Sequence, residues 1–360
     1  PPQAPGPGSA PTSGPRFGVR TRLHSGTATR RRFVLLVTGA LVVLAVAGVL
    51  GLGIGSHPVP PADVLDALLH YDPTNNDHLL VVASRLPRAV LGVVVGIALG
   101  LAGALMQAVT RNPLADPGLL GVNAGAAFAV VLAIAYLGVV DVGAYLPFAF
   151  AGAAVAAVGV YALGSAHRSQ ATPARMALAG AAVAIVIGAM TSAVLMSHQS
   201  AFNRFRYWAV GSLQGRGLDV VAVIVPFVLV GVVLALVLAR PLNAVALGED
   251  ASRSLGVNPV LTRGGSALAV VLLAGAATAA AGPIGFVGLA APHIVRGVVG
   301  PDQRLVLPAT LVVAPAFLLT ADVLGRWLIA PGELQTGIAA AVLGGPLFVA
   351  LVRSRRMASL

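Results

Sequence analysis

The sequence predicts an all-α protein that crosses a membrane about ten times. Of its 360 residues, 57% are hydrophobic and 10% are charged, whereas a soluble domain carries about 25% charged residues. A membrane-crossing helix needs about 20 apolar residues. Runs near this length cover 33–55, 87–108, 118–138, 143–164, 174–196, 220–239, 265–281, 286–299, 305–323 and 337–352. Because 286–299 is short and Gly or Pro interrupts several other runs, eight or nine spans remain alternatives.

The two ends of the chain are predicted to be tails. The first 29 residues are rich in Pro, Gly, Ser and Thr and have no apolar period, which indicates disorder. Three arginines precede the first apolar run, as in a signal peptide, but this run is long and lacks a small-x-small cleavage site. We therefore expect a disordered basic cytoplasmic tail (1–32), a transmembrane domain (33–352) and a cytoplasmic C-terminal tail (353–360).

The residue types exclude several kinds of chemistry. All 23 basic residues are Arg, so the chain has no P-loop lysine to contact nucleotide phosphates. It has no Cys, and its seven His form neither HExxH nor an i, i+4 pair suited to a metal. The net charge of +11 comes largely from arginines beside apolar runs, which favours membrane orientation over nucleic-acid binding. We expect no enzymatic activity, no cofactor and no bound metal.

Ten spans would place both termini in the cytoplasm, and the positive-inside rule agrees for most loops. Arginines that this topology places on the external side of the membrane need another explanation, and two are open. Either they dock an acidic external partner, or they reach lipid headgroups. The exceptions are Arg85, Arg88, Arg204, Arg206, Arg216 and Arg326.

The segment 240–263 lies between two apolar runs and is long for a simple connection. Its pattern predicts two short amphipathic helices, the first ending at Gly248 and the second at Gly256. Leu242, Val245 and Ala246 give the first helix an apolar edge, which another protein could grip. A solvated loop with chance helical spacing is the alternative.

Three further features have structural interpretations. Arg111–Pro117 contains two prolines, which predicts a turn capped by Asn and Asp rather than a substrate site. Four glycines between 92 and 103 recur every three or four residues, which predicts close helix packing. For His293, three residues before Arg296, we favour a helix-end hydrogen bond over a metal or proton role.

The motifs RLPRAV from Arg85, TRNPLADPG from Thr110, AGPIGFVGLAAPHIVRG from Ala281 and GELQTGI from Gly332 occur in this order. With the segment 240–263, they closely resemble the FecCD/BtuC-type permeases of bacterial ABC importers. The resemblance covers about 33–352. It implies a BtuC-like, type II permease fold with ten helices per protomer and a permease dimer. It also implies two ABC ATPase subunits inside and a substrate-binding protein outside.

The resemblance also implies roles for particular residues. It assigns binding-protein docking to Arg85, Arg88 and Arg326. It assigns ATPase coupling to Leu247, Gly248, Glu249, Leu255 and Gly256. It places the translocation pathway and a cytoplasmic gate at Thr172, Arg175, Met190 and Thr191, with Met196 nearby. Gln335 departs from the family pattern, which commonly has Pro at that position.

Uptake of a chelated iron, as a ferric siderophore, is the function we expect, in the bacterial inner membrane. Cobalamin or haem is the alternative cargo. An ion-coupled secondary transporter is disfavoured because Asp116, Arg175, Asp322 and Arg326 lie near the ends of apolar runs. A membrane receptor would explain external arginines but not the segment 240–263.

Overall fold

The computed structural model describes residues 26–139, 141–165 and 173–353, and within these ranges the chain is helical with no strand. Helix α1 (Gly26–Gly53) begins before the tail boundary expected at residue 33. Residues 26–32 therefore belong to the first helix, whose candidate span is Ala28–Gly53. Most of both predicted tails lies outside the described residues.

All ten predicted spans have a helix. In the described part of the chain, seven helices are long and apolar enough to cross a membrane, and three shorter apolar helices complete the set. The long ones are α1, α4 (Leu86–Thr110), α6 (Val142–Ser165), α7 (Pro173–Ser197), α9 (Leu218–Val237), α12 (Pro259–Ala281) and α14 (Gln303–Leu328). The shorter ones are α5 (Val122–Leu137), α13 (Val287–Val299) and α15 (Thr336–Arg353).

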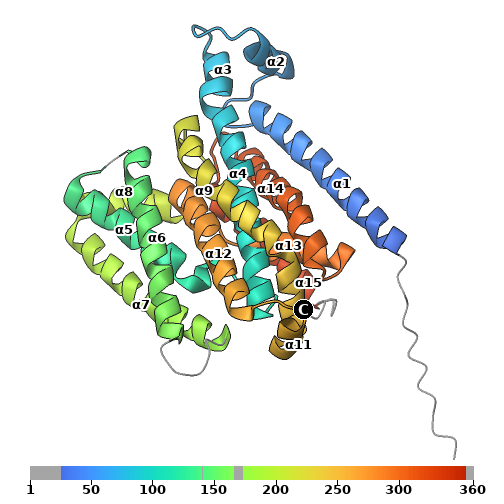
Figure 1. Ribbon diagram of the computed structural model, residues 1–360. Helices are drawn as coiled ribbons and strands as arrows, with labels where there is room; N and C mark the ends of the chain where they lie inside the picture. The colour runs from blue at the N-terminus through green and yellow to red at the C-terminus, as the bar shows by residue number, and fades with distance from the viewer. Residues whose placement is uncertain (1–25, 140, 166–172, 354–360) are drawn as a thin grey trace, which may run out of the picture.

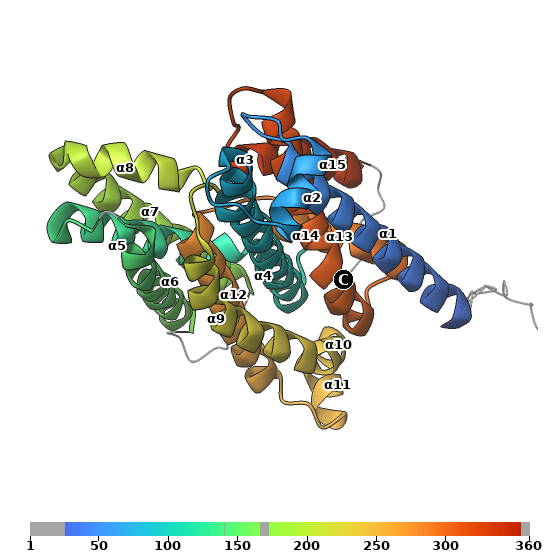
Figure 2. The ribbon, with the colours of Figure 1, turned by 90° about the horizontal axis from the view of Figure 1, so that it is seen from above.

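Helices α4, α12 and α14 form the centre of the bundle. Their most apolar windows are 72%, 67% and 72% buried, whereas those of α1 and α7 are 6% and 11% buried. Seen from above, α1 and α8 (Gln199–Ala209) lie on opposite sides of this centre (Figure 2). The sides of α1 and α7 that face outward are therefore free to contact lipid or another chain.

The glycine spacing of α4 does allow close packing, as predicted. A Cβ atom added at Gly96 would lie 2.5 Å from the backbone of Pro315, and one at Gly103 would lie 2.0 Å from the carbonyl oxygen of Gly288. Such separations are far below van der Waals contact. Glycine therefore sets how near α14 and α13 approach the central helix.

Several helices outside the spans were not predicted. The segment between the apolar runs 33–55 and 87–108 contains α2 (Pro61–Leu69), α3 (Asn76–Leu79) and a π-helical segment, η1 (Leu80–Arg85). Together α3, η1 and α4 form one continuous helical stretch of 35 residues. This stretch extends beyond the apolar run, so the α2–α3 pair stands out at one end of the bundle (Figure 1).

The turn predicted at Arg111–Pro117 is present. Arg111 adopts a left-handed backbone conformation (φ 50°) that ends α4. The Asn112 side chain accepts a hydrogen bond from the Leu114 amide (2.9 Å), and Asp116 accepts one from the Gly118 amide (2.8 Å). The two polar side chains thus cap the backbone between α4 and α5.

Candidate functional site

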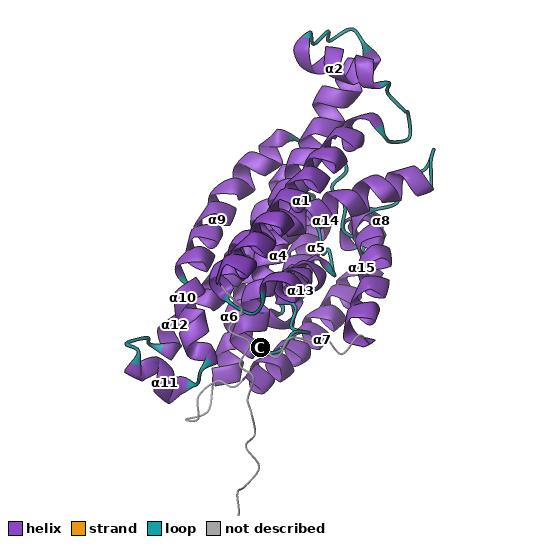
Figure 3. Cartoon of the chain, turned by 90° about the vertical axis from the view of Figure 1, so that its right-hand side faces the viewer, coloured by secondary structure: helices purple, strands orange, loops and turns teal. Residues whose placement is uncertain are grey.

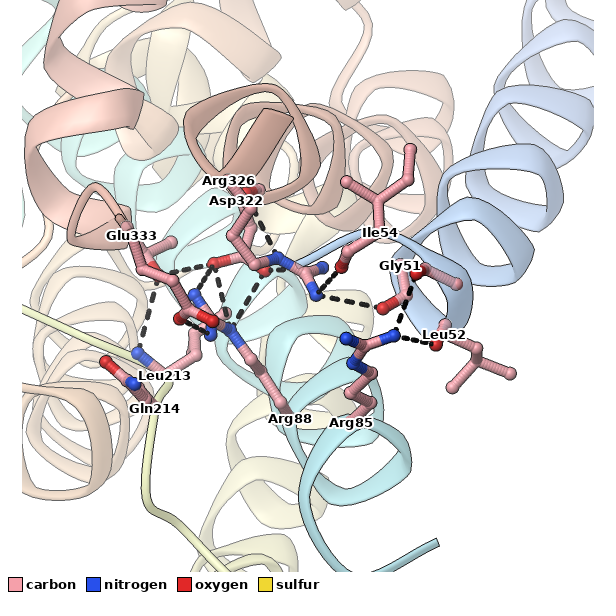
Figure 4. Close-up of polar contacts among 12 residues, drawn as sticks. Gly51, Leu52, Ile54, Arg85, Arg88, Leu213, Gln214, Asp322, Arg326 and Glu333 are labelled. Carbon is pink, nitrogen blue, oxygen red and sulfur yellow. Dashed lines mark hydrogen bonds and ion pairs between the residues drawn. The ribbon is translucent and has the colours of Figure 1, made fainter. Parts of the chain in front are cut away.

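Three arginines predicted to dock an external partner are buried inside the chain. Arg85, Arg88 and Arg326 are only 5%, 6% and 3% exposed. Arg85 and Arg88 lie at the start of α4, and Arg326 lies near the end of α14. With Asp322 and Glu333 they form a group that we call the arginine cluster, and Figure 4 shows how its side chains meet.

Asp322 is the centre of the arginine cluster. Its carboxylate is 2.9 Å from Nη2 of Arg88 and 3.1 Å from Nη2 of Arg326, and its side chain is 1% exposed. It also accepts a hydrogen bond from the Thr336 hydroxyl at 2.6 Å. Arg88 makes a second ion pair, to Glu333 at 2.6 Å. These contacts join α4, α14 and the segment that leads into α15.

Arg85 and Arg326 also cap the end of α1. The last turn of a helix leaves carbonyl groups without intrahelical partners and carries partial negative charge. Arg85 donates hydrogen bonds to the carbonyls of Leu52 (2.7 Å) and Gly53 (2.8 Å). Arg326 donates to those of Gly51 (2.9 Å) and Ile54 (2.8 Å). The two guanidinium groups therefore hold α1 to the centre of the bundle.

The expectation that Arg85, Arg88 and Arg326 present free charges to the outside is thus corrected. The chain supplies their acceptors itself, as carboxylates and helix-end carbonyls, so docking through them would require an exchange of partners. Their docking role remains a prediction.

The exposed arginines on α8 are Arg204 and Arg206. Hydrogen bonds from Leu213 and Gly337 connect the segment after α8 to the start of α15.

At the other end of the bundle, the segment 240–263 contains the two predicted helices. They are α10 (Ala239–Ala246) and α11 (Glu249–Ser254). Gly248 (φ 113°) and Gly256 (φ 77°) adopt positive φ values at the ends of the helices, as the sequence predicted. A side chain at either position would strain the backbone. Figure 3 shows α11 and α2 at opposite ends of the molecule.

Of the apolar edge predicted for the first helix, Leu242 and Val245 face inward and Ala246 is exposed. Leu242 and Val245 are 4% and 5% exposed because they pack inside the chain. Leu247 and Leu255 instead are 69% and 62% exposed. Glu249 forms an ion pair with Arg263 (2.8 Å), which connects α11 to the start of α12, and a longer one with Arg253 (3.6 Å) inside α11. The segment therefore exposes two leucines, and the ion pair with Arg263 holds α11 to α12.

Polar contacts join α10 to the rest of the bundle. Asn243 donates a hydrogen bond to Asp302 (2.6 Å) and accepts one from the Gln303 amide (2.9 Å), at the start of α14. Arg111, at the end of α4, donates one to the carbonyl of Val245. A hydrogen bond from the Arg304 side chain lowers the pKa of Asp302, so this carboxylate is ionised at neutral pH. A movement of α10 would thus reach α4 and α14 directly.

The residues predicted for a pathway and gate are not brought together. Thr172 lies outside the described residues, and Arg175 is exposed at the start of α7. Met190 is 48% exposed, but Thr191 is 7% exposed and its hydroxyl donates to the Ile187 carbonyl of its own helix (2.8 Å). Thr191 is therefore buried and bonded within its own helix, whereas Met190 lies on the exposed face of α7. A pathway role for these residues remains a prediction.

The burial of a fourth arginine, Arg296, was not recognised in the sequence. Arg296 is 4% exposed and donates to the side chain of Gln107 at 2.5 Å, while Gln107 donates to the Gly288 carbonyl at 3.0 Å. Among the described residues, no hydrogen bond involves the ring of His293, so the helix-end bond expected for it is absent. Arg296 and Gln107 instead join α13 to α4.

Comparisons with known proteins agree with this architecture. Residues 43–354 match the model of the FecCD transport family. The ferric enterobactin transport system permease protein FepD of Escherichia coli K12 is 44% identical over 89% of this chain and 96% of its own length. The Fe(3+)-citrate import system permease protein YfmD of Bacillus subtilis 168 is 38% identical over 92% and 98%.

A solved structure described as an inward-facing metal-chelate-type ABC transporter has the same fold. It covers 89% of this chain and 99% of its own, with a TM-score of 0.78 and 25% identity. The family match covers most of the residues described above, including the arginine cluster and the segment 240–263. The helical fold, the order of the motifs and these relatives lead to one conclusion: the chain belongs to the FecCD transport family.

Proposed function

We propose that this chain is the permease subunit of an ATP-driven importer of a ferric siderophore, in the bacterial cytoplasmic membrane with both termini inside. The observation that carries the proposal is the family match over 43–354, whose relatives named above are permeases for iron chelates. The chain would supply the membrane path, and a separate ATPase subunit would hydrolyse ATP. The absence of any lysine supports this division, since a P-loop requires one.

The segment 240–263 would receive the force from the ATPase. Leu247 and Leu255 expose large apolar side chains, which a partner surface can bury. Each contributes about 1.5–3 kcal/mol if fully buried. Because α10 is hydrogen-bonded to α14 and α4, a displacement there would be transmitted into the central helices.

The exposed side of α7 would face a second permease, either a copy of this chain or a paralogue. Its apolar window is only 11% buried, and side chains such as Leu178 (72% exposed) and Ile185 (72%) have no cover within the chain. Lipid would cover the outer side of α1 in the same way. A substrate-binding protein would dock at the end that carries α2 and α8.

An ATP hydrolysis assay on the chain reconstituted with its ATPase tests the proposal. The purified permease in nanodiscs, mixed with the ATPase and a siderophore-loaded binding protein, should hydrolyse ATP faster than the ATPase alone. A protein coupled to ions would show no such stimulation and would move the chelate in response to a proton gradient. A receptor without transport activity would bind the loaded protein and leave hydrolysis unchanged.

A further inference from the structure

The end of the molecule that carries α2 and α3 exposes several large apolar side chains. Leu65, Leu68 and Leu69 are 58%, 45% and 66% exposed. Their i, i+3 and i+4 spacing places them on one side of α2. Tyr71 and Leu79, in the segment that follows, are 47% and 42% exposed. We call these five residues the leucine patch. Exposed apolar side chains gathered among polar residues are typical of an interaction site.

The leucines of α2 face outward because the inner side of this helix is already filled. Val64 and Ala67 are 7% and 0% exposed and pack with Val81 of η1 in a small hydrophobic core. The connection between α2 and α3 is also fixed. Its Asp72 amide donates a hydrogen bond to Nδ1 of the buried His78 (3.1 Å). The α2–α3 pair is therefore a firm support for the leucine patch.

The same part of the chain is acidic. Residues 56–79, which we call the acidic cap, contain four Asp and no Glu or Arg, although the net charge of the whole chain is +11. With neutral histidines, the acidic cap therefore has a formal charge of −4. Asp63 and Asp66 are exposed on α2, within two residues of Leu65. Whatever covers the leucine patch must also accept this negative charge.

Position and charge disfavour lipid as the cover of the leucine patch. Asn76, the first residue of α3, is nine residues before Arg85 of the arginine cluster, or about 13 Å along the helix. The continuous stretch of 35 residues is about 52 Å long, whereas the hydrocarbon core of a bilayer is about 30 Å thick. Anionic lipid headgroups also repel carboxylates. The acidic cap therefore extends beyond the hydrocarbon core.

Charge also disfavours a second copy of this chain. A two-fold contact between leucine patches would bring two acidic caps together, and like charges across an interface are costly. The exposed Arg204 and Arg206 could compensate this charge, but they lie on α8. Figure 2 shows α8 on the opposite side of the bundle from α1, whereas α2 lies next to α1. A soluble external protein with a basic surface remains as the occupant.

We propose that the leucine patch is a docking surface for the substrate-binding protein, which would meet it with an apolar face bordered by Lys or Arg. The proposal rests on the proposed function and adds a contact of opposite polarity to it. Docking through the arginine cluster requires an acidic partner and arginines that are now buried. In the acidic cap, the chain supplies the carboxylates, and they are already exposed. Unlike charges would guide the approach, and burial of the leucines would hold the complex.

A fluorescent label in the leucine patch tests the proposal. The chain has no Cys, so Leu69→Cys provides one labelling site. We would label this full-length variant in nanodiscs with an environment-sensitive fluorophore and titrate it with the siderophore-loaded binding protein of the same importer. We expect the emission of a water-exposed label before the addition and a saturable blue shift after it. Leu41→Cys is the lipid-facing control, 49% exposed on α1, and its emission should be apolar throughout.

Unlabelled variants give the second part of the test. Asp63→Arg should raise the Kd of docking about tenfold, because it replaces an attraction with a repulsion. Asp219→Arg is the matched control. Asp219 is also exposed in the first turn of a helix, but it lies on α9, outside the acidic cap, and its variant should leave the Kd unchanged. Leu65→Ser combined with Leu68→Ser should also raise the Kd at least about tenfold. All these side chains are exposed, so the variants should fold as the parent does.

Three results would overturn the inference. The first is apolar emission at Leu69 before the binding protein is added, which would show that lipid or a second copy covers the patch. The second is docking that leaves labels at both Leu69 and Leu79 unchanged, since Leu79→Cys is a second reporter if the first label blocks docking. The third is an equal Kd for Asp63→Arg and Asp219→Arg.

Failure of this inference is separable from failure of the proposed function. Stimulation of the ATPase by the loaded binding protein, with no change at Leu69 or Leu79, would refute the docking surface and leave the importer. A saturable blue shift at Leu69 without ATP-dependent uptake would leave the docking surface and refute the importer.

Discussion

Removing the carboxylate of Asp322 should strongly destabilise the permease without any partner present. This group is 1% exposed and lies within 3.1 Å of two guanidinium groups. In the Asp322→Ala variant, Arg88 would keep Glu333 and Arg326 would keep two carbonyls, but both charges would lose their most buried counterion. Breaking a buried ion pair from one side costs about 3–5 kcal/mol, and we expect a loss of this size.

Equilibrium denaturation of the purified chain in mixed micelles measures this loss. The matched control is the Arg304–Asp302 pair, which has a similar N–O distance of 2.8 Å but whose arginine side chain is 60% exposed. Arg304→Gln should cost at most about 1 kcal/mol because solvent screens that pair. The milder Asp322→Asn, combined with Arg88→Gln, should lose less than the sum of the two single variants.

The same measurement separates an internal role of the arginine cluster from a docking role. If the cluster acts only on an external partner, Asp322→Ala and Arg88→Glu would weaken docking and leave the stability of the free chain intact. A stability change below about 1 kcal/mol for Asp322→Ala, far under the range for buried pairs, would refute our reasoning. Any docking loss in arginine variants should therefore be normalised to the folded fraction.

The remaining predictions concern the segment 240–263. Leu247→Asp should weaken ATPase binding at least tenfold in a titration, since loss of about 1.5–3 kcal/mol corresponds to that factor or more; unchanged affinity would contradict the role of Leu247. Gly256→Val should impair substrate-stimulated hydrolysis because its φ of 77° resists a side chain, and parental coupling would argue against this. The lowered pKa of Asp302 means that its stabilising contact persists above the ordinary aspartate pKa, about 3.9, and is lost as pH falls through the folded-state value. The hydrogen-exchange protection factors of α10, which correct for the intrinsic effect of pH, should therefore stay constant between pH 6 and 8 and fall only under stronger acid, whereas a change near neutrality would implicate another group.

The spans and the segment 240–263 were predictable because each depends on local sequence. Ten apolar runs gave ten helices, and glycine after a helical pattern marked the ends of α10 and α11. The direction of the leucines was harder to predict. Leu242 packs inside because α10 lies against the bundle, while Leu247 projects from its end. Helical spacing alone does not tell which apolar edge a neighbouring helix covers.

The arginine cluster was not predictable in the same way, because its contacts join residues far apart in the chain. Arg88 and Asp322 are separated by 234 positions, and the acceptors of Arg85 and Arg326 are carbonyls at the end of α1. One signal was available in the sequence. Asp322 lies near the end of the apolar run 305–323, four residues before Arg326, and an acidic group in such a run is expected to be paired.

Iron uptake by proteoliposomes tests the central claim most directly. The permease would be reconstituted with its ATPase, and the initial rate of radiolabelled ferric siderophore uptake measured with the binding protein outside and ATP inside. We predict uptake that requires ATP, continues in the presence of a protonophore, and falls to background with the Leu247→Asp variant. Uptake that proceeds without ATP, or that a protonophore abolishes while ATP is present, would contradict the account.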